Sequence, residues 1–430
     1  MSDAAPARRV EYLLVGGGLA SATAAEEIRK RDPNGAILIV AGEPHPPYHR
    51  PPLSKEYLRG EIEAEGTYGA GGVFAQLEPW YGEQRVETLT GMSVSRLDTA
   101  ARTATLADGS SIAYGKALLA TGGRARALSI PGATLPGVRS LRTLDDANAL
   151  RDALATPNQR VVVIGSGFIG LEASANAMFR DARVSVVDMV ERAWPGMLTP
   201  DLSDWLQSEY TARGAEFHFG HIPREFIAGP NGRVAAARIA ANGVESPFDL
   251  PADLIIVGVG IQLNSEVASA SGLTVDPRHG IVVDDHLRTS APDVWAAGDI
   301  AAYPDPQMGR FHFEHWDNAI TSGQTAAANM TGGDERYTHV PYFFSDQFDL
   351  SLNMLGYPSP DAQVTVRGDR KNDHFTAVFV RDGRIRAALM VNDDAQMDAW
   401  REAIAANAVA PDQETLASAD FDPATLTAQA

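Results

Sequence analysis

Two glycine clusters occupy the same place in two similar segments of the sequence. YLLVGGGLASATAAEEI (residues 12–28) places glycines between an apolar run and a helix-like pattern, and VVVIGSGFIGLEASANA (residues 161–177) repeats the arrangement. A helix N-terminus offers free backbone N–H groups and the positive end of the helix dipole. It binds phosphate when the turn before it is tight and lacks side chains. Both segments therefore predict a cradle for the pyrophosphate of a dinucleotide.

Each cluster supplies the three small positions that such a cradle needs. They serve the tight turn, the approach of phosphate to the backbone, and the packing of helix on strand. These positions are Gly16, Gly18 and Ser21 in the first segment and Gly165, Gly167 and Gly170 in the second. Ser21 replaces the usual third glycine and is small enough to fit. One glycine motif is weak evidence, but two copies in the same frame are strong evidence.

An acidic residue follows each motif at the end of the next apolar run. These residues are Glu43 and Asp188. A carboxylate at this place accepts hydrogen bonds from ribose hydroxyls. Because Asp188 would repel a 2′-phosphate, the second site is predicted to prefer NADH to NADPH, although the nearby Arg192 weakens this preference.

The elements that must position these residues form two strand–helix–strand units, which predict two dinucleotide-binding domains with mostly parallel sheets. Apolar runs at 114–123, 252–260 and 293–301 extend the sheets. After residue 333 the pattern changes to antiparallel strands, with an Asp-Gly hairpin at 382–383 and a helix over 394–408. The predicted fold class is α/β, with two Rossmann-like domains, a C-terminal α+β domain and a flexible acidic tail.

Composition excludes several kinds of site. The chain has no cysteine, so disulfides, thiolate metal sites and iron–sulfur ligation are excluded. A net charge of −19 argues against nucleic acid as a partner. No apolar run is long enough to span a membrane and no signal peptide is recognised, so the cytoplasm is the expected location. His218/His221 and His312/His315 would diverge on strands, so no metal site is predicted.

Further motifs extend over most of the chain. They are PYHRPPLSK (47–55), LLATGGRAR (118–126), LRTLDDA (141–147), RTSAPDVWAAGD (288–299), EHWDNAITSGQTAAANMTG (314–332) and FFSDQFD (343–349). Together with the glycine segments, they resemble the FAD-containing, NADH-dependent ferredoxin reductases of bacterial oxygenase systems and the apoptosis-inducing-factor-like oxidoreductases. The resemblance implies that the first cradle holds non-covalent FAD and the second holds NADH. It also implies a discontinuous FAD domain (1–125 and 247–332), an NAD domain (126–246) and a C-terminal domain (333–430).

The same resemblance implies roles for individual residues. The residues that it places at the FAD or NADH site, besides the glycine motifs and their acids, are Arg50, Lys55, Thr121, Gly122, Arg126, Gly260, Asp299 and Glu314. It pairs Lys55 with Glu172 near the reacting ring, where the cation would stabilise negative charge. It also places His315 and Trp316 beside the isoalloxazine, at the start of a helix whose dipole would act in the same sense. No protein acid or base is needed for hydride transfer between the two cofactors.

Three functions remain open at this point. The first is a reductase that passes electrons to a ferredoxin-type protein, and the second is an NADH oxidase or quinone reductase. The third is a redox sensor that holds a reduced flavin–NAD complex and signals through a homodimer or a partner. His315, and Phe344 in place of a tryptophan, favour this third function, which is the apoptosis-factor-like one. The acidic net charge disfavours docking of an acidic ferredoxin, unless a basic cluster steers it: Arg367, Arg370 and Lys371. The favoured interpretation of this cluster is a solvated hairpin tip.

Overall fold

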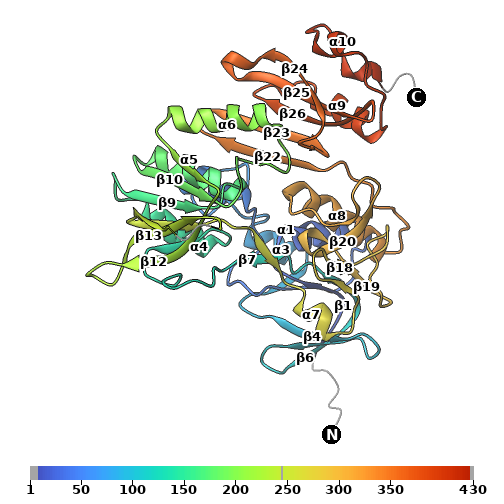
Figure 1. The fold of residues 1–430 in the computed structure, drawn as a ribbon. Coiled ribbons are helices and arrows are strands. Elements are labelled where there is room, and N and C mark those ends of the chain that lie inside the picture. Colours follow the sequence, from blue (N-terminus) through green and yellow to red (C-terminus); the bar gives the residue numbers. More distant parts are fainter. Residues whose placement is uncertain (1–7, 244–245, 427–430) are drawn as a thin grey trace. The chain divides into compact units, whose positions relative to one another are not determined.

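The computed structural model describes residues 8–243 and 246–426 (Figure 1). The chain divides into two compact units. Unit 1 comprises Met1–His49, Glu63–Arg124 and Gln262–Pro341, and unit 2 comprises Arg50–Ile62, Ala125–Ile261 and Tyr342–Ala430. The chain passes between the units five times, after residues 49, 62, 124, 261 and 341. Two of these crossings lie in β7 (Gly123–Ala125) and β16 (Ile261–Leu263). The predicted α/β class is confirmed, whereas the division into three domains stays a prediction.

A Rossmann-like sheet forms the centre of unit 1. Its order is β3-β2-β1-β6-β5-β4, with β19 beside β6. The strands are β1 (Arg8–Val15), β2 (Ile37–Val40), β3 (Val86–Leu89), β4 (Val94–Asp98), β5 (Thr103–Leu106), β6 (Ser111–Leu119) and β19 (Val294–Ala296). β1 lies parallel to both β2 and β6, and the Leu, Ile and Val side chains of these strands are buried. Burial on both faces explains their continuous apolar sequence.

Small residues let two helices pack closely in unit 1. Helix α1 (Leu19–Arg31) contacts α8 (Trp316–Met330). A Cβ at Gly323 of α8 would lie 2.6 Å from the carbonyl oxygen of Ala20 and 2.5 Å from Oγ1 of Thr23. This close approach explains why α1 carries the sequence SATAA. The remaining elements of unit 1 are α3 (Glu78–Glu83), α7 (Glu266–Ala270), β17 (Val275–Asp276), β18 (Gly280–Val282), η2 (Gly298–Ile300), β20 (Ala301–Asp305) and β21 (Gly309–Phe311).

A second parallel sheet lies in unit 2, in the order β11-β10-β9-β15-β8. Its strands are β8 (Val138–Ser140), β9 (Arg160–Ile164), β10 (Arg183–Asp188), β11 (Glu216–Phe219) and β15 (Leu254–Val257). The other elements here are η1 (Pro51–Ser54), α2 (Glu56–Arg59), α4 (Leu144–Ala153), α5 (Phe168–Phe179), α6 (Pro200–Ala212) and the three-stranded sheet β12 (His221–Ala228), β13 (Val234–Ala241) and β14 (Phe248–Pro251). The strand–helix–strand frame predicted around the second glycine motif is thereby confirmed.

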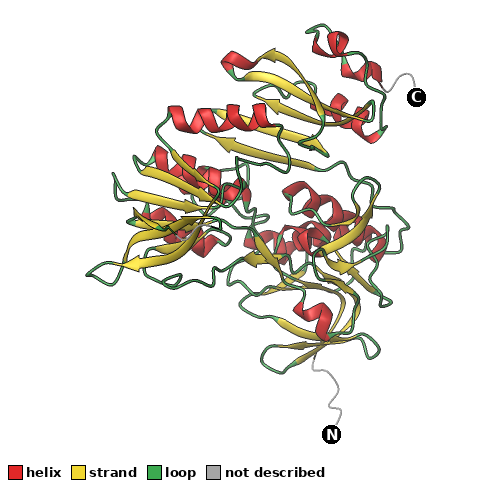
Figure 2. Cartoon of the chain, viewed as in Figure 1, coloured by secondary structure: helices red, strands yellow, loops and turns green. Residues whose placement is uncertain are grey.

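Strands are the main secondary structure of the C-terminal segment of unit 2 (Figure 2). It forms an antiparallel sheet in the order β22-β23-β26-β25-β24. The strands are β22 (Tyr342–Gln347), β23 (Leu350–Gly356), β24 (Gln363–Asp369), β25 (His374–Arg381) and β26 (Arg384–Val391). Asp382 and Gly383 both have positive φ, at 54° and 68°, as the predicted two-residue hairpin requires.

Short helices follow this sheet. They are α9 (Met397–Ala405), α10 (Gln413–Ala417) and η4 (Pro423–Leu426), beside the short η3 (Arg370–Asn372) earlier in the segment. The Arg367 guanidinium lies 5.9 Å from the ring centroids of both Trp400 and Phe421. The expected flexible tail thus includes helical residues up to 426, and its last four residues, 427–430, lie outside the described ranges.

The C-terminal sheet shares an apolar core with helices α5 and α6 of the Rossmann-like part of unit 2. Trp205 of α6 packs edge-on against Phe375 of β25, with 5.1 Å between ring centroids, and its Nε1 donates to Asp373 Oδ1 at 2.9 Å. Figure 1 shows α6 running beside this sheet. Within residues 8–243 and 246–426, no helix combines the length and the apolar character needed to cross a bilayer.

Candidate functional site

The first glycine turn presents a helix N-terminus with no side chain over it. Gly18 is the N-cap of α1, and no side chain caps the helix there. A Cβ at Gly18 would meet no atom within 4 Å, whereas a Cβ at Gly16 (φ +123°) would lie 2.1 Å from the carbonyl oxygen of Ala120. Gly16 is therefore required by the turn, and the space beside Gly18 suits a ligand. Ser21, at the third motif position, is completely buried.

The second glycine turn has the same construction. Gly167 is the N-cap of α5, with no side-chain cap, and a Cβ there would also meet nothing within 4 Å. A Cβ at Gly165 would lie 2.3 Å from the carbonyl oxygen of Gly258, and one at Gly170 would lie 2.0 Å from that of Gly165. Both turns thus fit the phosphate cradles expected from the sequence.

The two acids that follow the motifs are both engaged. Glu43, just beyond β2, accepts a hydrogen bond from the Tyr48 hydroxyl. Asp188, at the end of β10, accepts from the backbone N–H and the hydroxyl of Ser166, at 2.6 and 2.7 Å. Asp188 is thereby held against the glycine turn, as a ribose-binding carboxylate requires. Arg192 pairs with Glu191 at 2.6 Å.

One asparagine holds two predicted flavin-site residues in unit 1. Thr121 Oγ1 donates to the carbonyl oxygen of Asn264 at 2.7 Å, and the Asn264 amide donates back to the Thr121 carbonyl at 2.9 Å. The Asn264 N–H also bonds the carbonyl of Gly122 at 2.9 Å. Asn264 was not among the predicted site residues, although it ends the segment GVGIQLN (258–264), in which Leu263 replaces a proline that is usual in the related reductases.

Three further predicted residues lie in unit 2. The N–H of Arg126 donates to the carbonyl of Gly260 at 3.0 Å, and its guanidinium donates to the Ile261 carbonyl at 3.0 Å. The Arg50 guanidinium donates to the carbonyl of Arg142 at 2.5 Å. The structure therefore joins Arg126 and Gly260 by their backbones and orients Arg50 separately. The cofactor roles of all three stay predictions.

Trp316 belongs to a cluster of three rings in unit 1. Its Nε1 donates to Nδ1 of His49 at 2.8 Å, and the His49 ring stacks on Tyr68 with 4.4 Å between centroids. Burial lowers the pKa of His49 to about 4, so the ring is neutral at neutral pH and can accept this hydrogen bond. The sequence motifs did not single out His49, although it lies inside PYHRPPLSK, nor Tyr68.

The depressed pKa of His49 predicts a stability that falls with acid. The folded-state pKa of about 4 lies below the ordinary value of 6.5, so the unfolded chain binds the proton first as pH falls. This contribution is complete above the ordinary pKa and is lost toward pH 4. We expect His49→Gln, which keeps an acceptor for Trp316, to reduce the loss of unfolding free energy between pH 7 and pH 5 by about 1–2 kcal/mol. Urea unfolding at both pH values measures it, and equal losses in the two proteins would contradict it.

His315 stands at the start of α8 as its N-cap. Burial lowers its pKa to about 4, while the negative charge of Asp299 opposes the shift and His312 adds to it. Glu314 Oε1 accepts a hydrogen bond from Nε2 of His312 at 3.1 Å. The structure thus groups Asp299, Glu314 and His315 around the N-terminus of α8, where the dipole is positive.

Lys55 and Glu172 form a buried ion pair in unit 2. Lys55 Nζ lies 2.7 Å from Glu172 Oε1, and their side chains are 4% and 2% exposed. Glu172 also accepts hydrogen bonds from the hydroxyls of Ser54 and Ser345. The Lys55 ammonium lies 5.1 Å from the centroid of the Phe344 ring. The structure contains the pairing that the resemblance implied. The two serines, which stand inside PPLSK and FFSDQ, were missed.

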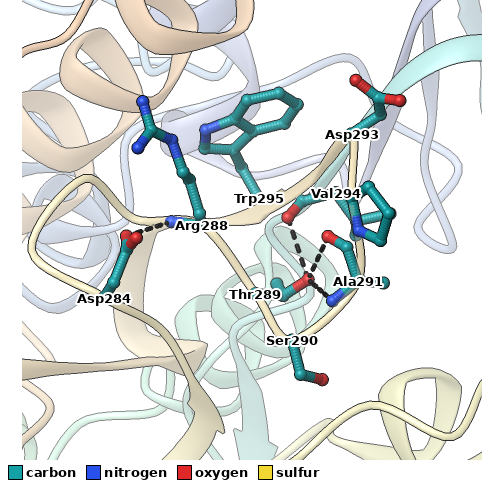
Figure 3. A pocket seen from close by; sticks show the side chains of 9 residues that line it. Asp284, Arg288, Thr289, Ser290, Ala291, Asp293, Val294 and Trp295 are labelled. Atoms are coloured by element: carbon teal, nitrogen blue, oxygen red, sulfur yellow. Dashed lines mark hydrogen bonds between the residues drawn. The ribbon is translucent and has the colours of Figure 1, made fainter.

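A shallow hollow of about 360 Å³ lies elsewhere in unit 1 (Figure 3). It is lined by Asp284, Arg288, Thr289, Ser290, Ala291, Pro292, Asp293, Val294 and Trp295. Thr289 Oγ1 closes the turn through hydrogen bonds to Ala291 and Val294. The hollow contains none of the predicted site residues and reflects the shape of a surface turn.

Two other features of the described residues have structural explanations. Asp284, Asp285 and His286 lie close enough to share a cation, but Asp285 also pairs with Arg336 at 3.4 Å. Arg367 of the basic cluster is only 7% exposed. Its neighbour Arg370 pairs with Asp201 at 3.0 Å. Arg367 and Arg370 of that cluster are therefore engaged in contacts within unit 2.

Comparison with known proteins agrees with this geometry. The family model described as pyridine nucleotide-disulphide oxidoreductase matches residues 10–323, and the reductase C-terminal model matches residues 342–427. The chain is 36% identical to the anthranilate 1,2-dioxygenase system ferredoxin–NAD(+) reductase component of Burkholderia cepacia, over 94% of this chain and 96% of that protein. It is 34% identical to the probable ferredoxin reductase CtmF of Castellaniella defragrans, over 91% and 93%.

Solved structures give the same picture. The ferredoxin reductase for the CYP199A2 system from Rhodopseudomonas palustris has a TM-score of 0.88 and 33% identity, covering 96% of this chain and 99% of that chain. The covalent putidaredoxin reductase–putidaredoxin complex contains a chain with a TM-score of 0.89 and 30% identity, covering 99% of both.

Proposed function

Because the chain belongs to the pyridine nucleotide-disulphide oxidoreductase family, we propose that it is an NADH-dependent flavoprotein reductase that passes electrons to a ferredoxin. The observation that carries this proposal is the pair of uncapped helix N-termini at Gly18 and Gly167, each beside a space that a Cβ would enter. Relatives named as ferredoxin–NAD(+) reductases support ferredoxin as the acceptor. Disulfide reduction is excluded because the sequence contains no cysteine.

The two turns would hold different dinucleotides. In this proposal Gly16 and Gly18, with Glu43, bind FAD, while Gly165 and Gly167 bind NADH. When bound, FAD supplies the chemistry that links a two-electron hydride donor to a one-electron acceptor. Thr121, Gly122, Arg50, Arg126, Gly260, Asp299, Glu314, His315 and Trp316 complete the proposed binding residues. Lys55 supplies a positive charge for the reaction, and Glu172 keeps its ammonium in place.

The proposal can be tested directly on the purified protein. It should carry a yellow flavin, lose the flavin absorbance on anaerobic mixing with NADH, and then reduce an added [2Fe–2S] ferredoxin. A colourless protein that stays colourless after refolding with excess FAD would overturn the proposal. Rapid reoxidation by air with no electron transfer to ferredoxin would favour an oxidase instead. A long-lived reduced flavin–NAD complex would favour the redox sensor, toward which His315 and Phe344 lean. Action in the cytoplasm and assembly as a homodimer belong to the same proposal.

Asp188 should set the choice between NADH and NADPH. Asp188→Asn removes the negative charge and keeps an oxygen that can accept from Ser166. We expect the ratio of kcat/KM for NADH to that for NADPH to fall about tenfold, since a 2′-phosphate would no longer face a carboxylate. Steady-state assays with both coenzymes measure the ratio. Asp253→Asn, which alters an exposed acid of the same unit, is the control, and an unchanged ratio in Asp188→Asn would contradict the assignment.

A further inference from the structure

The C-terminal sheet contributes a hydrogen bond to the buried ion pair. Ser345 of β22 donates its hydroxyl to Glu172 Oε1 at 2.6 Å, and the same oxygen receives the Lys55 ammonium at 2.7 Å. Ser345 is completely buried. A buried carboxylate needs hydrogen bonds as well as a counter-ion to be stable in one position. Ser345 and Lys55 therefore share the task of fixing this oxygen.

Ser345 is itself held by a second row of buried side chains. Gln347 Nε2 donates to Ser345 Oγ at 2.9 Å, and the Tyr210 hydroxyl of α6 lies 2.8 Å from Gln347 Oε1. Gln347 and Tyr210 are both completely buried. With its oxygen occupied by Gln347, the Ser345 hydroxyl hydrogen is directed to Glu172. The row runs from helix α6 through strand β22 to the carboxylate.

We propose that Ser345 is a positioning residue, which acts through Glu172 to fix the Lys55 ammonium. This inference rests on the proposed function, because the position of the Lys55 ammonium affects the reaction only if the protein binds a flavin. Phe344, the neighbouring residue on β22, places its ring 5.1 Å from Lys55 Nζ. Two successive residues of the C-terminal sheet thus touch the two members of the pair, so this sheet contributes to the electrostatics of the reaction centre. A cation acts on a developing negative charge only when its position is fixed beforehand.

The redox potential of the bound flavin tests the proposal, because a merely structural contact would leave it unchanged. In Ser345→Ala we expect a more negative two-electron potential, equivalent to about a tenfold loss of preference for reduced flavin, which is about 30 mV. Ser345→Thr keeps the hydroxyl and should restore most of the shift. Thr365→Val changes a buried hydroxyl on β24, at the opposite edge of the same sheet, and should leave the potential unchanged.

A second arm separates this inference from the proposed function. In a Lys55→Met background, Ser345→Ala should cause no further shift, because the cation through which it acts is gone. A wild-type potential in Ser345→Ala, or an equal shift with and without Lys55, would overturn the positioning role while the proposed function stands. A protein that takes up no FAD would overturn both. Chemical unfolding of each variant, which needs no cofactor, should show Ser345→Ala destabilising the protein with and without Lys55, because the Ser345 hydroxyl bonds the Glu172 carboxylate in both backgrounds.

Discussion

Replacing Lys55 with methionine is expected to lower the free energy of unfolding by about 3–5 kcal/mol. The replacement leaves the Glu172 carboxylate, which is 2% exposed, without its cation. The hydroxyls of Ser54 and Ser345 still bond this carboxylate, but neutral donors do not balance a buried charge. Urea unfolding of the apoprotein measures the change, and the rate of flavin reduction by NADH in the loaded protein should fall as well.

Substituting Glu172, the other member of the ion pair, tests the pairing more strictly. Glu172→Gln alone leaves the Lys55 ammonium buried without a counter-ion and should destabilise the protein by a similar amount. The double variant Lys55→Met/Glu172→Gln removes both charges and should recover much of the stability, yet it should not recover fast flavin reduction. Arg160→Met breaks the exposed pair with Asp253 and should cost less than about 1 kcal/mol. Additive effects of the two buried substitutions would contradict the pairing.

The sequence predicted the parts of the site that lie within one segment. Gly16, Gly18, Gly165 and Gly167 stand in strand–turn–helix units whose apolar and small-residue patterns are local, so the amino-acid sequence alone locates both turns. The Asp382-Gly383 hairpin was predictable for the same reason, because two residues with positive φ define the turn. Local patterns are sufficient where the chain makes the site from neighbouring residues.

The contacts that orient the polar groups could not be predicted in this way. Ser345 and Glu172 are 173 positions apart in the sequence, and His49 and Trp316 are 267 apart. No local pattern encodes which hydroxyl meets which carboxylate after folding, so motif resemblance supplied the Lys55–Glu172 pair and missed Ser345. The basic cluster that includes Arg367 shows the opposite error, because its charges were predicted to be solvated and Arg367 is buried. Charge spacing cannot reveal that its guanidinium lies against Trp400. The contacts of these side chains arise only when distant segments pack together.

The glycines of the second turn predict opposite outcomes for two neighbouring substitutions. In Gly165→Ala the new Cβ would lie 2.3 Å from the carbonyl oxygen of Gly258, and the residue has a φ of +103°. Backbone strain and overlap together should cost about 2–5 kcal/mol of unfolding free energy. Gly167 has a φ of −72°, and a Cβ there would meet nothing within 4 Å. Gly167→Ala should therefore change the unfolding free energy by less than about 1 kcal/mol.

Gly167→Ala, which should have little effect on stability, should have a large effect on the binding of NADH. The Cβ of Gly167→Ala would enter the space that a pyrophosphate needs at the N-terminus of α5, so the affinity for NADH should fall about tenfold or more although the protein is folded. Titration calorimetry with NAD⁺ or NADH, together with urea unfolding, separates the two effects. Gly18→Ala makes the matching change at the first turn and should weaken FAD while leaving NADH binding intact. If Gly167→Ala bound NADH as tightly as the unchanged protein, the bare helix end would be a feature of packing, and the nucleotide would have to bind elsewhere.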